Sequence, residues 1–516
     1  MKRTLLTHAA RGIMLTVLLL LVSCKQTSSA PATVAPHQNG AVDVCSAGQA
    51  GVPCTAITGL DLSDCQITPA TLRWLAGCSS LKVLTMDFAT PLDDESLRSL
   101  AGLVQLQRLS LRGTGVTGAG LKHLRELRDL TDLDISGEWV SNVLDHVGSF
   151  PRLRRLSISV STLSAADAEH LRSLKHLESL EVHLWGTKIS DSSMALAAKL
   201  PGLRRLALQG TSVSDAGLGE LARAAALVEL ELGNNHELSE DALLRLSSIP
   251  RLESLRLTGW NGQEWIGASP RQTFTLKHVA KLKNLRTLAT GDMRTLGIPL
   301  AELAELTNLE VLELNCVRDA AGSNIETWRK LRNLRVLKGP PGLTDAGLRE
   351  VGKCTGISHL ELCGSEITNA GMGEIRDLPL RRLRVVGTRI TDDAMASIAG
   401  FRRLEYLGLV DVRTRIGDAG LERLRQLADL RHLELQSCEV ATRFTNVGLR
   451  SLVALPSLRT LELGLFPMPW TDAELDEFRL AAPKCKIVQI WPGMTVDPGE
   501  SHIGGVGIDV ERERRP

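Results

Sequence analysis

The sequence predicts an α/β solenoid, a curved stack of about 17 strand–helix repeats with a parallel sheet on the concave side and helices on the convex side. Leucine accounts for 90 of the 516 residues, whereas Phe, Trp and Tyr together number 16. One apolar side chain therefore fills most interior positions, which is typical of a single slot repeated many times. In addition, the phrase LxxLxL recurs at nearly even intervals along the chain.

The full repeating phrase is LxxLxL, a few turn residues, an apolar residue, and then Thr/Ser-Asp-Ala-Gly-Leu-x-x-Leu. Clear copies occupy 106–124 and 203–218. The phrase begins at positions 57, 81, 106, 130, 153, 177, 203, 227, 252, 285, 309, 334, 357, 380, 404, 430 and 458, and a half unit begins at Cys485. The repeats thus cover 57–484 with a mean period of about 25 residues, a length typical of solenoid repeats.

Each unit has the spacing of one strand followed by one short helix. Leu109 and Leu111 are two residues apart and so share one face of a strand. Leu121, Leu124 and Leu127 follow at the spacing of one helical stripe. One such unit cannot bury its apolar face alone, so neighbouring units must stack.

Thr or Ser marks the expected start of many helices, where its side-chain oxygen can cap free backbone N–H groups. The expected capping residues are Thr117, Ser214, Thr344, Thr391 and Thr471. An Asp often follows, because the positive end of the helix dipole favours a carboxylate. Examples are Asp215, Asp345 and Asp392.

The repeated phrase resembles the leucine-rich repeat family over residues 57–490, which implies a horseshoe-shaped solenoid. The subtype resembles the cysteine-containing repeats of F-box proteins and similar bacterial proteins, because other residues replace the usual ladder asparagine. Those residues are Cys65, Thr114, Thr211, Ser365, Thr388 and Cys438. The units that begin at 285, 309 and 334 depart most from the phrase, so the sequence does not predict the local curvature of the solenoid there.

The N-terminal segment resembles the export signal of a bacterial lipoprotein. Basic residues precede an apolar run, 12–22, that is shorter than the roughly 20 residues of a membrane span. The run leads into Leu21-Val22-Ser23-Cys24, which resembles a lipobox. That resemblance implies removal of 1–23, acylation of Cys24, and anchoring to a membrane of the cell envelope, on its periplasmic or extracellular face. A plain signal peptide with an incidental cysteine and an uncleaved anchor are the alternatives.

Four shorter segments flank the repeats. Residues 24–44 are rich in Ala, Pro, Ser and Thr and predict a disordered tether. Residues 45–56 are expected to cap the first repeat, with a disulfide between Cys45 and Cys54. At the other end, 485–493 is expected to form a cap strand and 494–516 a disordered tail.

Composition and motifs argue against several functions. The 60 Lys and Arg residues balance 59 Asp and Glu, and no block of like charge occurs, so nucleic acid has no electrostatic footprint here. GxSxG, GxxxxGKS/T, HExxH and strand-linked GxGxxG motifs are absent, so we expect neither enzyme activity nor a cofactor. No CxxC pair indicates structural zinc, and cysteines within the repeats are expected to be small buried apolar residues. We expect a monomer.

The predicted concave face carries charged side chains in adjacent columns. The residue between the second and third leucine of the phrase is often acidic, and arginines recur two positions earlier. The candidate partner-binding residues on this face are Asp134, Glu181, Arg205, Glu231, Arg256, Glu361, Arg384, Tyr406, His432 and Glu434. Opposite charges on neighbouring strands can also pair with each other and keep the surface soluble. A docking face for a protein is the alternative.

Aromatic residues gather in the segments that leave the predicted strands, and these segments form one rim of a solenoid. The candidate anchors are Trp139, Trp185, Trp260, Trp265, Phe466 and Trp470, and Phe88 has an equivalent position. Exposed aromatic residues are common interface anchors, and packing between neighbouring turns is the alternative. The unit that begins at 252 runs 33 residues, and its insertion, 260–274, falls where binding faces commonly carry insertions.

Three hypotheses of binding or catalytic function result, and a purely structural spacer is the alternative to all three. The first is a lipid-anchored scaffold that binds a protein, or a cell-wall glycan, through the concave face and the strand-exit rim. The second, from resemblance alone, is an F-box-like adaptor of a ubiquitin-ligase type complex. The third is a metal-dependent enzyme centred on His359 and Glu361, which with Cys363 place three potential ligands on one strand face. Solvated polar residues are the simpler interpretation of that trio.

Overall fold

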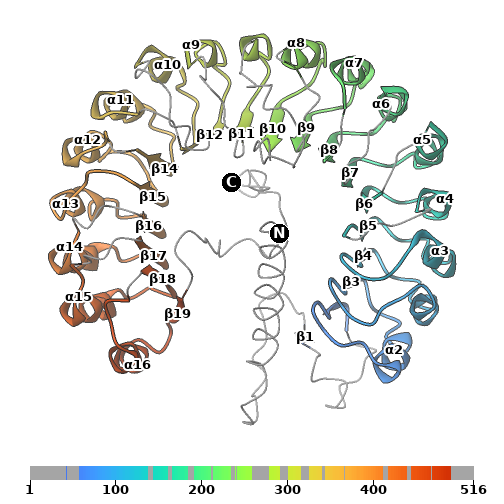
Figure 1. Ribbon diagram of the computed structural model, residues 1–516, viewed down its shortest axis with the longest axis horizontal. Helices are drawn as coiled ribbons and strands as arrows, with labels where there is room; N and C mark the ends of the chain where they lie inside the picture. The colour runs from blue at the N-terminus through green and yellow to red at the C-terminus, as the bar shows by residue number, and fades with distance from the viewer. Residues whose placement is uncertain are drawn as a thin grey trace, which may run out of the picture.

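The computed structural model describes residues 42–43, 57–137, 143–160, 165–183, 191–210, 213–233, 239, 241–258, 278–290, 300–314, 325–339, 343–364, 366–410, 416–437, 443–465 and 468–489. Within these ranges, 19 strands form one parallel sheet in which each strand is hydrogen-bonded to the next in chain order. Figure 1 shows this sheet lining the inside of an open horseshoe, with the helices around the outside. The predicted α/β leucine-rich-repeat solenoid is therefore confirmed.

Each of the 17 predicted repeats contributes one strand, which begins two residues after the first leucine-type position of its phrase, and one further strand lies at each end of the sheet. The strands are β1 (Val42–Asp43), β2 (Gly59–Asp61), β3 (Val83–Thr85), β4 (Arg108–Ser110), β5 (Asp132–Ile135), β6 (Arg155–Ser159), β7 (Ser179–His183), β8 (Arg205–Gln209), β9 (Glu229–Gly233), β10 (Ser254–Thr258), β11 (Thr287–Thr290), β12 (Val311–Leu314), β13 (Val336–Lys338), β14 (His359–Cys363), β15 (Arg382–Val386), β16 (Tyr406–Val410), β17 (His432–Ser437), β18 (Thr460–Leu465) and β19 (Lys486–Gln489).

The convex side consists of short α-helices and 3₁₀ turns. The α-helices are α2 (Pro69–Ala76), α3 (Gly118–Leu121), α4 (Leu144–Val147), α5 (Ala165–Arg172), α6 (Asp191–Ala197), α7 (Asp215–Glu220), α8 (Ala242–Leu246), α9 (Leu300–Leu303), α10 (Ile325–Lys330), α11 (Asp345–Val351), α12 (Asn369–Glu374), α13 (Ala394–Ile398), α14 (Asp418–Arg423), α15 (Asn446–Ser451) and α16 (Asp472–Ala481). The 3₁₀ turns are η3 (Ser96–Leu100), η4 (Lys122–Leu124), η5 (Leu221–Arg223), η6 (Val279–Lys281), η7 (Leu424–Gln426) and η8 (Leu452–Ala454).

The core lies between the sheet and the helices and continues from one repeat to the next. In the unit that begins at 106, Leu109 and Leu111 of the strand segment and Leu121, Leu124 and Leu127 of the helical segment are all buried, as predicted. Each further unit adds leucines at the same positions, so a single hydrophobic cluster extends along the whole solenoid. The leucine excess is thus a direct consequence of the repeat.

Hydrogen bonds join the start of one helix to the start of the next. The Thr368 hydroxyl accepts a hydrogen bond from the Ala370 N–H at 3.3 Å. Asp345, one repeat earlier, accepts from the Thr368 N–H and hydroxyl at 2.9 and 2.6 Å. Equivalent pairs, which we call the Asp–cap relay, are Asp94–Thr117, Asp191–Ser214, Asp215–Ser239 and Asp418–Thr445. For Asp215 and Asp345 the sequence pattern indicated only an interaction with the helix dipole and gave no sign of this link between repeats.

A glycine three residues after the capping position makes room for this relay. A Cβ atom on Gly371 would lie 2.3 Å from the Asp345 Oδ1 of the preceding repeat, closer than any real Cβ contact. The same close approach to a preceding aspartate occurs at Gly120, Gly217, Gly420 and Gly448. Only glycine lets the carboxylate come so near the backbone.

Most predicted helix caps are confirmed. Thr117, Ser214, Thr344 and Thr471 each accept a hydrogen bond from a backbone N–H in the first turn of a helix. Thr391 differs, because its hydroxyl accepts from the N–H of Asp393, the residue that precedes α13.

The cysteines of the repeats fall into two groups. Cys78, Cys354 and Cys485 carry buried free thiols, as expected, and burial raises the pKa of Cys485 to about 11. Cys65 and Cys363 are disulfide-bonded, so the prediction that they are only small buried residues is wrong for these two. The predicted Cys45–Cys54 disulfide lies outside the described residues.

The ends of the sheet refine the predicted boundaries. β1 pairs in parallel with β2, so the sheet begins within the segment expected to be a tether. β19 pairs with β18 and lies within the expected cap strand, 485–493. Among the helices of the described ranges, none combines the length and the apolar character needed to cross a bilayer. The segment 1–23, Cys24 and the tail 494–516 are not among the described residues.

Candidate binding surface

The concave surface is formed by the strand residues that alternate with the buried leucines. Because the strands are parallel and in register, equivalent residues form columns across the sheet. The central column from β2 to β18 consists of Asp61, Thr85, Ser110, Asp134, Ser157, Glu181, Ala207, Glu231, Arg256, Ala289, Glu313, Lys338, Glu361, Arg384, Gly408, Glu434 and Glu462. Seven of the ten candidate concave residues lie in it. Arg205, Tyr406 and His432 lie in the column two residues earlier.

On β5 and β7, the carboxylates of the central column bind the residue two positions further along the chain. Asp134 Oδ1 accepts from the N–H and the hydroxyl of Ser136 at 2.8 and 2.6 Å. Glu181 Oε1 lies 2.9 Å from His183 Nε2. Burial alone would raise the pKa of Glu181, but the hydrogen bond from His183 and the charges of His183 and Arg205 hold that pKa below its usual value. Glu181 is therefore ionised at neutral pH, and its side chain is 25% exposed.

On β9, Glu231 is bound by side chains of the neighbouring strand. Arg205 Nη2 donates to Glu231 Oε2 at 3.0 Å, and Gln209 Nε2 donates to Oε1 at 2.8 Å. The Glu231 side chain is only 8% exposed. Between β2 and β9 the central column itself contains no Lys or Arg, so this cation comes from the adjacent column.

Basic residues join the central column from β10 onwards. Arg256 Nη1 lies 3.7 Å from Glu313 Oε2, two strands away, and Ala289 is the residue between them in register. Lys338 Nζ lies 3.2 Å from the other oxygen of Glu313. Charges here neutralise one another along the column.

The most extensive pairing spans β14 to β17. Arg384 Nε and Nη2 donate to the two carboxylate oxygens of Glu434 at 3.0 and 3.1 Å, and its Nη1 donates to Glu361 Oε1 at 3.0 Å. Gly408 lies between Arg384 and Glu434 in register. A Cβ atom there would be 2.6 Å from Glu434 Oε2 and 2.8 Å from Arg384 Cγ. The absence of a side chain at Gly408 therefore lets the guanidinium cross β16.

Two rings complete this cluster. The Tyr406 hydroxyl donates to Glu434 Oε2, and its ring stacks on His432 with the centroids 4.7 Å apart. Arg382 lies 3.7 Å above the Tyr406 ring. Burial raises the pKa of Tyr406 and the charge of Glu434 raises it further, so the hydroxyl stays protonated and keeps donating. The five predicted residues that these contacts unite, here the Arg384 network, are Glu361, Arg384, Tyr406, His432 and Glu434.

The strand-exit rim is represented by few described residues. Trp470 is 4% exposed, its indole N–H donates to the Thr445 carbonyl at 2.9 Å, and its ring stacks on Phe444. Trp470 is therefore not an exposed anchor but packs between neighbouring turns, which corrects the prediction. Phe88, in contrast, is 48% exposed. The other candidates and the insertion 260–274 lie outside the described residues, namely Trp139, Trp185, Trp260, Trp265 and Phe466.

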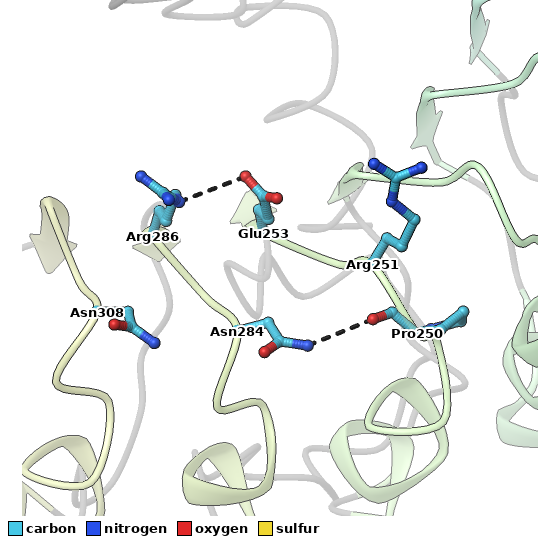
Figure 2. Close-up of a pocket in the computed structure, with 6 residues that line it drawn as sticks. All are labelled: Pro250, Arg251, Glu253, Asn284, Arg286 and Asn308. Atoms are coloured by element: carbon cyan, nitrogen blue, oxygen red, sulfur yellow. Dashed lines mark hydrogen bonds and ion pairs between the residues drawn. The ribbon is translucent and has the colours of Figure 1, made fainter.

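A shallow pocket of about 260 Å³, which sequence analysis missed, lies at the edge where the chain leads into β10 and β11 (Figure 2). Asn284 Nδ2 donates to the Pro250 carbonyl at 3.3 Å, and Arg286 Nε lies 3.5 Å from Glu253 Oε2. The remaining lining residues are Arg251 and Asn308. Several of its polar groups are thus bonded to each other, which indicates a structural role.

The asparagines of this pocket belong to a short ladder. Asn308 Nδ2 donates to the Lys283 carbonyl at 3.2 Å, and Asn333 Nδ2 donates to the Thr307 carbonyl at 2.8 Å. An Asn directly before the first leucine of three successive phrases was the available signal. These are the units at 285, 309 and 334, whose later phrase is degraded, and the ladder links their strand starts instead.

The proposed metal-binding trio has other partners. His359 Nδ1 lies 2.9 Å from the Ser358 hydroxyl, Glu361 binds Arg384, and Cys363 is disulfide-bonded. Nowhere in the described part of the chain do three or more His, Cys, Asp or Glu residues gather as a metal site would require.

Comparisons with known proteins give matches among solved structures alone, since no protein-family model and no curated protein matches the sequence. A leucine-rich repeat protein of Leptospira interrogans is 20% identical, with 80% of this chain and 97% of that chain covered and a TM-score of 0.38. TLR13, from its complex with ssRNA13, is 17% identical, with coverage of 84% and 71% and a TM-score of 0.48. Rad7, from its complex with Elc1 in yeast, is 20% identical, with coverage of 66% and 87% and a TM-score of 0.43.

Proposed function

We propose that this protein is a non-catalytic scaffold of the bacterial cell envelope that binds a protein partner on its concave face. The observation that carries the proposal is the central column, in which 14 of the 17 residues are polar or charged. It lies on the inner side of an open horseshoe, whose course Figure 1 shows. Such repeats fix the curvature of the scaffold and leave recognition to the surface side chains.

Charge favours a protein over a nucleic acid as the partner. From β2 to β9 the central column holds Asp61, Asp134, Glu181 and Glu231 and no basic residue. Phosphate groups are bound by clustered Lys and Arg and would be repelled by a row of carboxylates. A polypeptide can supply the complementary cations.

Site-specific photo-crosslinking in intact cells tests the concave face. A photoreactive amino acid in place of Ser157 lies on the concave side, and one in place of the exposed Lys122 in η4 lies on the convex side. We expect a discrete cross-linked protein from position 157 and none from position 122. Equal capture from both positions, or none from either, would contradict the proposal.

The membrane anchor is a separate part of the proposal, supported by the sequence Leu21-Val22-Ser23-Cys24. We expect the native protein to fractionate with membranes and to carry acyl chains at the amine and thiol of Cys24. Cys24→Ala should abolish the acyl mass, measured by intact-protein mass spectrometry. If the acyl mass persists in the variant, or is lacking in the native protein, the proposed anchor is wrong. The proposal for the concave binding face would not be affected.

A further inference from the structure

Carboxylates and small side chains alternate in the central column from β5 to β9. In register, the residues are Asp134, Ser157, Glu181, Ala207 and Glu231. Successive carboxylates are therefore two strands apart, or about 9.6 Å between backbones at about 4.8 Å per strand. Ser157, between Asp134 and Glu181, is short and partly exposed and leaves an open slot between these two carboxylates, whereas Ala207 is buried.

The other half of the same column shows what such a slot binds. Arg384 lies across Gly408 and reaches Glu434, two strands away, at 3.0 and 3.1 Å. Arg256 likewise reaches Glu313 across the register position of Ala289. In both cases the slot over a small residue holds the side chain of a cation. The chain supplies that cation itself on these strands.

On β5 and β7 the central column supplies no cation. Among the described residues, neither Asp134 nor Glu181 has a Lys or Arg at ion-pair distance, and each is held by the residue two positions further along the chain. Both side chains are partly exposed. Glu231 differs, because Arg205 and Gln209 already bind it and almost cover it. The open carboxylates are therefore Asp134 and Glu181, with Ser157 between them.

We propose that Asp134, Ser157 and Glu181 bind a cationic segment of the partner, in which two Lys or Arg residues lie on one face of an extended chain. This inference rests on the proposed function and specifies the chemistry of the partner. In a polyproline II helix, every third residue shares a face at about 9.3 Å, close to the two-strand spacing. Side chains on one face of a β-strand are about 6.8 Å apart and do not match. The segment therefore carries Lys or Arg at every third residue.

Peptide binding to the full-length mature protein in detergent tests this inference. The probe is a fluorescein-labelled peptide of four Lys-Pro-Pro repeats, and its composition-matched control is Lys-Lys-Pro-Pro-Pro-Pro repeated twice. We expect the evenly spaced peptide to bind more tightly in fluorescence anisotropy, with an affinity that falls as salt rises. The double variant Asp134→Asn, Glu181→Gln should weaken it about tenfold, from two partly exposed ion pairs.

The matched control variant is Glu374→Gln. Glu374 is a partly exposed carboxylate, at 33%, but it lies at the end of α12 on the convex side and Arg349 already binds it. We expect this variant to bind the peptide like the native protein. Equal loss in the control variant, native affinity in the double variant, or no preference for the evenly spaced peptide would overturn the inference.

The two proposals fail separately. If the partner still cross-links to position 157 but the evenly spaced peptide does not bind, the cationic segment is wrong while the concave binding face stands. If cross-linking from position 157 is lost as well, both proposals are wrong.

Discussion

The strands β5–β9 and β14–β18 present equivalent columns, yet they treat charge in opposite ways. In the C-terminal group, Arg384 lies within the column and binds both Glu361 and the fully buried Glu434. In the N-terminal group, Asp134 and Glu181 stay partly exposed without a basic residue in their column. The sequence left two interpretations of the concave surface, charges that pair between strands and charges that stay open. The first describes the C-terminal strands, and the second describes β5 and β7.

Removing Arg384 should produce the largest effect. Arg384→Met leaves the carboxylate of Glu434 buried without its cation, and breaking a buried ion pair from one side costs about 3–5 kcal/mol. We expect reduced stability in urea unfolding and faster amide exchange in β14–β18. Adding Glu434→Gln should restore part of the loss, because no buried charge is then left. A single variant as stable as the native protein would show that the network does not hold this region together.

Gly408→Ala should have the next largest effect on stability. Alanine normally suits a strand better than glycine, but its Cβ would overlap Arg384 and Glu434, and overpacking of this kind costs about 1–3 kcal/mol. The equivalent small residue of the N-terminal group serves as the control, and Ser157→Ala should change the free energy of unfolding by less than about 0.5 kcal/mol. Equal effects at the two positions would mean that the slot over Gly408 is not occupied as described.

The Asp–cap relay should respond alike on both sides of the horseshoe. Asp94→Ala removes the partner of Thr117, and Asp345→Ala removes the partner of Thr368. Each loss should cost about 1 kcal/mol, the usual contribution of a helix cap. Urea unfolding would measure the loss of stability in both variants. Similar losses would confine the contrast between the two groups of strands to the concave face, and a large difference would show that it also exists on the convex side.

The smallest expected effect is a change in how the stability of the protein depends on pH. Because the folded-state pKa of Glu181 is depressed, its contribution to stability is present above the unfolded-state pKa of about 4.3 and is lost as pH falls through the folded value. We expect the thermal midpoint of the native protein to fall slightly more than that of Glu181→Gln between pH 5 and pH 3. Parallel curves would mean that His183 does not stabilise the ionised carboxylate.

The repeat spacing was sufficient to predict the sheet and the placement of the concave residues. The repeated phrase placed β2 to β18, and all ten candidate concave residues lie on these strands in adjacent columns, whereas β1 falls in the segment expected to be a tether. Alternate residues of a strand point to opposite faces of the sheet, so the residues between the buried leucines must lie on the concave face. For this reason the fold could be derived from local spacing alone.

Contacts between repeats could not be predicted in the same way. The reach of Arg384 across Gly408 depends on a residue two strands away and on the lack of a side chain between them. Trp470 was assigned to an exposed rim, but its partner, the Thr445 carbonyl, lies 25 residues earlier in the chain. The bonded state of Cys65 and Cys363 likewise depends on spatial neighbours that no spacing rule supplies.

The Asp–cap relay also gives the solenoid a direction. Each aspartate serves the helix of the following repeat and not its own, so Thr368 depends on the earlier Asp345. A repeat that has lost its N-terminal neighbour therefore loses a partner for its cap, whereas a repeat that has lost its C-terminal neighbour keeps its own. Units made first on the ribosome can thus form complete helix starts before later units exist, and folding can follow synthesis along the chain.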